Sequence, residues 1–169
     1  SDDEEYYLES AIADFINSSG QDMYVLTAAE GDDSYGSARD RADYFLLDMG
    51  YGNSDDGAIL YLIDMEYRQD YLSTAGVMID YITDYRRDDI FSDTKSYLQS
   101  GDFYGAADTF VRDTVYWYEQ GIPDGQHRTE ESGENSFTLL DAVITLVLAA
   151  AGFFIPLFII KGSYELKGS

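Results

Sequence analysis

Apolar side chains recur along this chain in two alternating patterns, one with helical spacing and one of short, nearly continuous runs. The helical pattern covers four segments, 8–20, 38–50, 84–101 and 102–121. Because apolar residues three and four positions apart share one face of a helix, these segments predict four amphipathic helices. A glycine stands at the end of each, as is common at helix C-termini. Asp102 directly precedes the fourth segment and is its predicted N-cap.

The short apolar runs predict three strands, at 23–27, 58–63 and 67–74. The middle run has no polar position, which is typical of a strand covered on both faces. A tight turn at 64–66 predicts that the third strand returns antiparallel to the second. The expected fold class is therefore α/β, with a small mixed sheet sandwiched by helices in the order α-β-α-β-β-α-α.

The pattern changes near residue 137. Residues 142–160 carry no charge, and as a helix they would rise about 28 Å, close to the ~30 Å of a bilayer core. A buried helix of a globular domain usually keeps a polar stripe, so the pattern favours a transmembrane helix. We expect four regions: an acidic α/β domain at 3–121, a linker at 122–136, one C-terminal transmembrane helix at 137–160 and a short basic tail at 161–169.

Charged residues near this apolar segment predict its orientation. Lys161 and Lys167 follow it, whereas acidic residues precede it, at Glu130, Glu131, Glu134 and Asp141. Lys and Arg near the end of a membrane helix mark the cytoplasmic side. We therefore expect a single-pass membrane protein with a cytoplasmic C-terminus and its soluble domain outside the cytoplasm.

The net charge of the chain is −23, from 33 acidic and 10 basic residues. Such a field repels phosphate backbones, so we expect no nucleic-acid partner, and it attracts divalent cations. The chain has no cysteine and a single histidine, His127. Any metal is therefore expected to have oxygen ligands, which favours Ca²⁺ or Mg²⁺.

A polar loop before the buried strand holds the candidate chemistry. Asp55 and Asp56 stand there beside Gly57. If the third strand runs antiparallel, its end and the acidic residues after it return to this loop. The sequence then predicts a cation site with four ligands and four further binding residues: Asp55, Asp56, Asp84 and Asp88, with Asn53, Thr74, Gly76 and Asp80. The alternative is that these are ordinary solvated turn and cap residues.

Four short stretches resemble, in order, motifs of a known family: 56–64, 71–76, 83–84 and 101–106. The succession is similar to the TPM domain, the family of thylakoid-lumen phosphatase-like and related bacterial envelope proteins, over roughly residues 5–121. The resemblance implies an α/β sandwich and, in some members, calcium binding and acid phosphatase activity. Many bacterial members place this domain outside the membrane beside a transmembrane helix, and several look like assembly or regulatory partners of membrane complexes.

Two functions follow as expectations. The first is a binding, assembly or regulatory module of the cell envelope, with a protein partner in the membrane or envelope and a divalent cation. The alternative is a metal-assisted acid phosphatase, in which cation-bound water attacks a phosphate ester. Asp55 and Asp56 would hold that metal, and Asp84 would be a general base or a third ligand.

Overall fold

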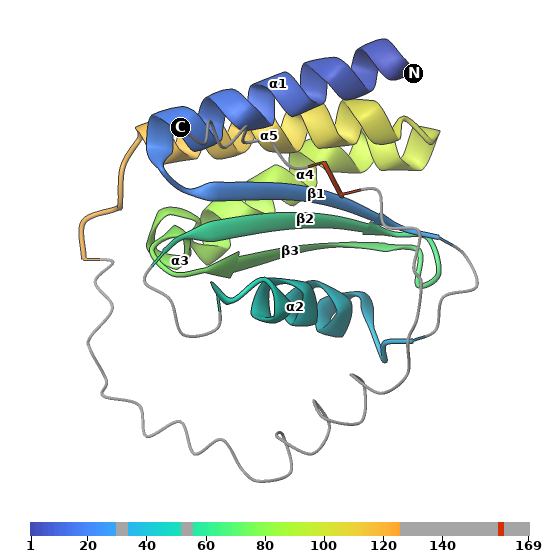
Figure 1. Cartoon of the computed structure of the whole chain (residues 1–169), viewed down its shortest axis with the longest axis horizontal. Coiled ribbons are helices and arrows are strands. Elements are labelled where there is room, and N and C mark those ends of the chain that lie inside the picture. The colour runs from blue at the N-terminus through green and yellow to red at the C-terminus, as the bar shows by residue number, and fades with distance from the viewer. Residues whose placement is uncertain (30–33, 52–55, 126–158, 161–169) are drawn as a thin grey trace, which may run out of the picture.

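The computed structural model describes residues 1–29, 34–51, 56–125 and 159–160 (Figure 1). Its elements follow in the order α1 (Asp2–Ser19), β1 (Asp22–Ala28), α2 (Ala38–Asp48), β2 (Ala58–Asp64), β3 (Gln69–Ala75), α3 (Met78–Tyr81), α4 (Asp84–Ser100), α5 (Phe103–Glu119) and β4 (Ile159–Ile160). The strands form a mixed sheet of order β3-β2-β1-β4, parallel between β1 and β2 and antiparallel at the other two pairings. The predicted α/β fold with a small mixed sheet between helices is confirmed.

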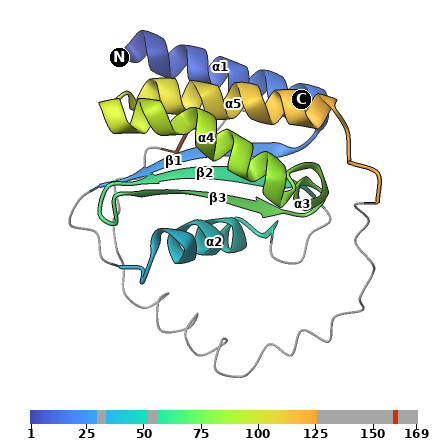
Figure 2. The same cartoon turned by 180° about the vertical axis from the view of Figure 1, so that it is seen from behind.

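The sheet lies between two helical layers. Helices α1, α4 and α5 cover one face and α2 covers the other, as Figures 1 and 2 show from opposite sides. Alternate residues of each central strand face opposite layers, because side chains in a strand alternate in direction. In β2, Ile59, Tyr61 and Ile63 join the core under α1, α4 and α5, whereas Leu60 and Leu62 join the core over α2. All seven residues of β2 are buried, as its unbroken apolar run predicted.

Helix ends follow the predicted signals closely. Gly20 and Gly101 cap α1 and α4 in the left-handed conformation, with φ of 71° and 78°. A side chain there would be strained, so glycine is the residue that suits both positions. Asp102 caps α5, and its carboxylate accepts a hydrogen bond from the Gly105 amide at 2.8 Å.

Three details differ from the sequence prediction. Helix α1 begins at residue 2 instead of residue 8, because the Ser1 side chain caps it. Strand β3 begins at Gln69 instead of Tyr67, because the Asp64 carboxylate accepts hydrogen bonds from the amides of Glu66 and Tyr67 and so extends the turn. The short helix α3 was not predicted. Its four residues are too few to show a helical period.

The predicted transmembrane helix lies outside the described residues, apart from its last two. Ile159 and Ile160 form strand β4, which pairs antiparallel with Leu26 and Val25 of β1. At these two positions the structure therefore has a strand where a helix was predicted, and isoleucine favours strands through its β-branched side chain. Within the described ranges, no helix is both long and apolar enough to cross a membrane.

A buried ion pair joins α2 to the sheet. Arg41 Nε of α2 lies 2.8 Å from Asp64 Oδ2 at the end of β2, and the two side chains are 4% and 0% exposed. The other Asp64 oxygen holds the β2–β3 turn, as described above. The Arg41 guanidinium also stacks over the Tyr35 ring at 4.8 Å. This pair thus connects α2, the end of β2 and the hairpin that leads to β3.

Replacing Arg41 by Met should lower the free energy of unfolding by about 3–5 kcal/mol, because it leaves the Asp64 carboxylate buried without its counter-charge. Arg39→Met is the matched control on the same helix. Its ion pair with Asp43 is exposed to solvent, so the loss should stay below about 1 kcal/mol. Urea unfolding of the full chain measures both variants. Equal losses would contradict a special role for the buried pair.

Candidate functional site

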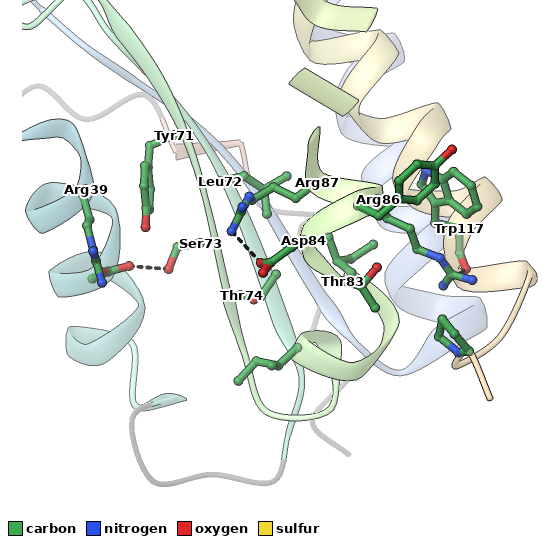
Figure 3. Close-up of a pocket in the computed structure, with 15 residues that line it drawn as sticks. Arg39, Tyr71, Leu72, Ser73, Thr74, Thr83, Asp84, Arg86, Arg87 and Trp117 are labelled. Carbon is green, nitrogen blue, oxygen red and sulfur yellow. Dashed lines mark hydrogen bonds and ion pairs between the residues drawn. The ribbon is translucent and has the colours of Figure 1, made fainter. Parts of the chain in front are cut away.

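An open groove of about 770 Å³ follows strand β3 (Figure 3). Its floor is the middle of β3, one wall is α2, and the other wall is α3 with the start of α4. The C-terminal end of α5 and the segment after it complete one end. The lining residues are Arg39, Asp43, Tyr71, Leu72, Ser73, Thr74, Ile79, Ile82, Thr83, Asp84, Tyr85, Arg86, Arg87, Trp117 and Pro123.

Strand alternation decides which side chains of β3 face each wall. Ser73 points toward α2 and donates a hydrogen bond to Asp43 Oδ1 at 2.7 Å. Tyr71 packs against the core on that same side. Leu72 belongs to the opposite core, under α1, α4 and α5. In the floor of the groove, Tyr71 and Ser73 therefore face α2, and Leu72 faces the opposite helical layer.

The groove has more positive than negative side chains, unlike the chain as a whole. Its lining includes three arginines and two aspartates, whereas the net charge of the chain is −23. Arg39 pairs with Asp43 at 3.4 Å. Arg87 pairs with Asp84 at 3.0 Å and with Asp88 at 3.4 Å. These pairs are solvent-exposed, and such pairs contribute little stability.

Arg86 ties the end of α5 to the groove. Its Nη1 donates hydrogen bonds to the backbone carbonyls of Tyr81, Trp117 and Gly121, at 2.7, 3.1 and 2.8 Å. The guanidinium also lies 4.7 Å from the centre of the Trp117 ring. The Arg86 side chain is buried, and burial lowers its pKa. Three helices thus meet at one side chain, which fixes the end of α5 against the start of α4.

One end of the sheet holds part of the predicted cation site. Because β3 runs antiparallel to β2, with Ala75 opposite Ala58, the residues after β3 return to the loop before β2, as predicted. A Cβ on Gly57 would lie 2.8 Å from a Val77 side-chain carbon, so the two segments are in close contact. At this end Asp56 is exposed and Asp80 is buried, and Gly76 is buried with a φ of 56°. Asn53 and Asp55 lie outside the described residues.

The remaining predicted site residues lie along the groove and α4. Thr74 and Asp84 line the groove, and Asp88 follows one turn further along α4. Both aspartates pair with Arg87, so a cation would compete with this guanidinium. Within the described part of the chain, no group of three or more acidic or histidine side chains could hold a metal ion. Sequence reasoning missed the groove arginines, although the adjacent pair 86–87 stands out in a chain this acidic.

The architecture defines a small α/β domain with a mixed sheet and a groove along one edge strand. The sequence profile of the TPM domain family matches residues 1–115, so the chain belongs to the TPM domain family. Among solved structures, it is similar to the NMR structure of the BA42 protein from the psychrophilic bacterium Bizionia argentinensis. The TM-score is 0.58 at 18% identity, over 73% of this chain and 83% of BA42, and this likeness supports the fold. No curated protein matches in sequence.

Behind the groove, helix α5 carries a carboxyl group with unusual surroundings. Asp113 Oδ2 is buried without a hydrogen-bond partner among the described residues, as are Thr114 Oγ1 and Trp117 Nε1. Burial raises the pKa of Asp113 to about 6. The nearby Asp93 carboxylate adds to this shift, and Arg112 opposes it. Asp113 is therefore a group whose charge changes near neutral pH.

The folded-state pKa of Asp113 lies above the value of about 3.9 expected in the unfolded chain. The native state thus holds this proton more tightly, so stability falls as the pH rises from about 4 to about 6, and the full loss remains above pH 6. Asp113→Asn should raise the free energy of unfolding at pH 8 by about 1 kcal/mol, and the gain should vanish near pH 4. The gain is smaller than the full pKa shift implies, because the side chain is partly exposed to water. Urea unfolding at both pH values measures this gain.

Proposed function

We propose that this TPM domain is a membrane-anchored binding module outside the cytoplasm that holds a protein partner of the cell envelope in the β3 groove. The observation that carries the proposal is the groove itself, which lies open along the edge strand of the sheet. Its volume falls within the range of about 300–1,000 Å³ that is common for ligand sites. The groove mixes apolar and polar side chains, so it offers both area to bury and polar groups that give specificity.

In the membrane-anchored form that we propose, Ile159 and Ile160 leave their pairing with β1, and the apolar segment 142–160 spans the bilayer. The length of this segment supports the membrane part of the proposal, and Lys161 and Lys167 support its orientation. Pro123, at the end of the groove, stands 19 residues before Ala142. An extended chain of that length reaches at most about 65 Å. The groove would therefore stay close to the bilayer, within reach of a partner in the membrane or on its surface.

The position of Asp84 favours a binding module over the alternative acid phosphatase. That mechanism would use Asp84 as a general base or as a third metal ligand. In the structure its carboxylate lies 3.0 Å from Arg87 Nη1, and the Asp84 side chain is 90% exposed. A carboxylate that is ion-paired and open to water lacks the dry, positioned surroundings that general-base catalysis needs.

A photo-crosslinking residue in place of Thr74 tests the binding function in the full chain, expressed in its host cell. We expect a discrete adduct with one protein in the membrane fraction, because Thr74 lines the groove. The same photo-crosslinking residue in place of Asp14, an exposed position of α1, should give no such adduct. Protease added to intact cells should remove the adduct if the domain lies outside the cytoplasm. An adduct absent at Thr74, or identical at both positions, would count against the groove.

A divalent cation at the Asp56 end of the sheet is a separate part of the proposal. The net charge of −23 and the close approach of Gly57 to Val77 and Met78 support it. Millimolar Ca²⁺ should raise the melting temperature of the full chain by several degrees at constant ionic strength, because a ligand of the native state stabilises that state.

The variant Asp55→Asn with Asp56→Asn should lose this calcium response. The matched variant Asp84→Asn with Asp88→Asn removes the same charge and should keep the response, since Arg87 already pairs with both carboxylates. NaCl at equal ionic strength controls for general screening. A response that NaCl reproduces, or that survives in the first variant, would show that no cation binds at Asp56.

A further inference from the structure

Among the strands that the structure describes, none pairs with the outer edge of β3. This strand stands at the end of the sheet order, and its pairing with β2 is unbroken over seven residues, Gln69–Ala75. Natural proteins usually protect such an edge with proline, a bulge or a covering element. This strand has neither proline nor bulge, and the two walls stand beside it and leave the groove between them open. At the opposite side of the sheet, β4 pairs with β1.

We infer that the partner enters the groove as an extended strand beside β3 and brings two adjacent acidic residues, one for Arg39 and one for Arg87. The inference rests on the proposed function and adds the shape and charge of the ligand. An extended peptide that joins a sheet edge gains affinity from main-chain hydrogen bonds and specificity from its side chains. Here the two arginines would supply the specificity.

The two arginines stand on opposite walls. Arg39 belongs to α2, beside Tyr71, and Arg87 belongs to α4, on the side of Leu72 (Figure 3). Consecutive side chains of a strand point to opposite faces of the sheet. An added strand would therefore direct two neighbouring residues toward different walls. A pair of adjacent acidic residues, rather than two that alternate, matches this geometry.

The guanidinium groups themselves favour carboxylates, whereas the net charge of the groove does not, because the aspartates that pair with them offset it. Each arginine now pairs with aspartates of its own helix in exposed ion pairs, so exchanging those partners for a ligand carboxylate costs little. A guanidinium can bind a carboxylate through two parallel hydrogen bonds, which are strong and directional. At physiological salt, charges more than about 8 Å away are largely screened. The local arginines, and not the overall charge of −23, would then determine the preference.

A library of random linear peptides of about 12 residues, displayed on phage and selected on the full chain, provides the probe. We expect enriched peptides to carry two adjacent Asp or Glu residues among β-branched and aromatic ones. Bound peptide should slow hydrogen exchange of the β3 amides in residues 69–75, because these amides become covered or hydrogen-bonded. The binding constant of each selected peptide is then measured with the variants below.

The double variant Arg39→Glu with Arg87→Glu should weaken binding of a selected peptide about tenfold or more, which is a loss of ~1.4 kcal/mol. It should also recover binding when the two acidic peptide residues are changed to Lys. Arg112→Glu is the matched control, because Arg112 forms a similar exposed i,i+4 pair with Asp108 on α5 and does not line the groove. This control should leave binding unchanged.

The outcomes separate the inference from the proposed function. Peptides that slow exchange in β3 but show no acidic pair, or bind the double variant equally well, overturn the inference and leave the groove as a binding site. A library that yields no peptide protecting β3 overturns both. Recovery of binding by the Lys-substituted peptide in the double variant supports both, because a folding defect would not be rescued by the opposite charge.

Discussion

The buried pair of Arg41 and Asp64 is the interaction on which the rest of the structure depends. It holds α2 against its face of the sheet, and the same carboxylate shapes the turn from which β3 begins. Arg39 lies two residues earlier on α2 and faces solvent at the groove, while Arg41 faces the interior. An interior charge pair thus positions the exterior charge that we assign to ligand binding. Loss of the first would displace the second, together with the wall that carries it.

Most of the fold could be predicted because its signals are local. An unbroken apolar run gave strand β2, and glycines marked the ends of α1 and α4, where the left-handed backbone favours them. The parts that were missed depend on contacts distant in sequence or on very short elements. The start of β3 depends on a side chain that holds its own turn, and α3 is too short to show a period.

The candidate site was harder to predict, because the sequence shows which residues are charged but not which of them form ion pairs. Acidic residues are abundant in this chain, so the sequence pattern favoured carboxylates and a cation. The antiparallel hairpin brought residues 56–57 and 76–80 to one end of the sheet, as expected. Two aspartates of α4, however, pair with Arg87 of the same helix: Asp84, three residues away, and Asp88, the next residue. Whether neighbouring opposite charges pair or face different directions depends on the helix surface around them, and the sequence pattern does not contain that information.

The open edge of β3 and the large negative charge have a joint consequence for the protein in a crowded environment. Two copies could in principle join edge to edge and continue into a chain of sheets. Each copy carries a charge of −23, however, and like-charged molecules keep apart in solution. Repulsion between these charges would oppose such assembly, as a covering element does in other proteins. The acidity of the domain would then limit self-association, and added salt would weaken this protection.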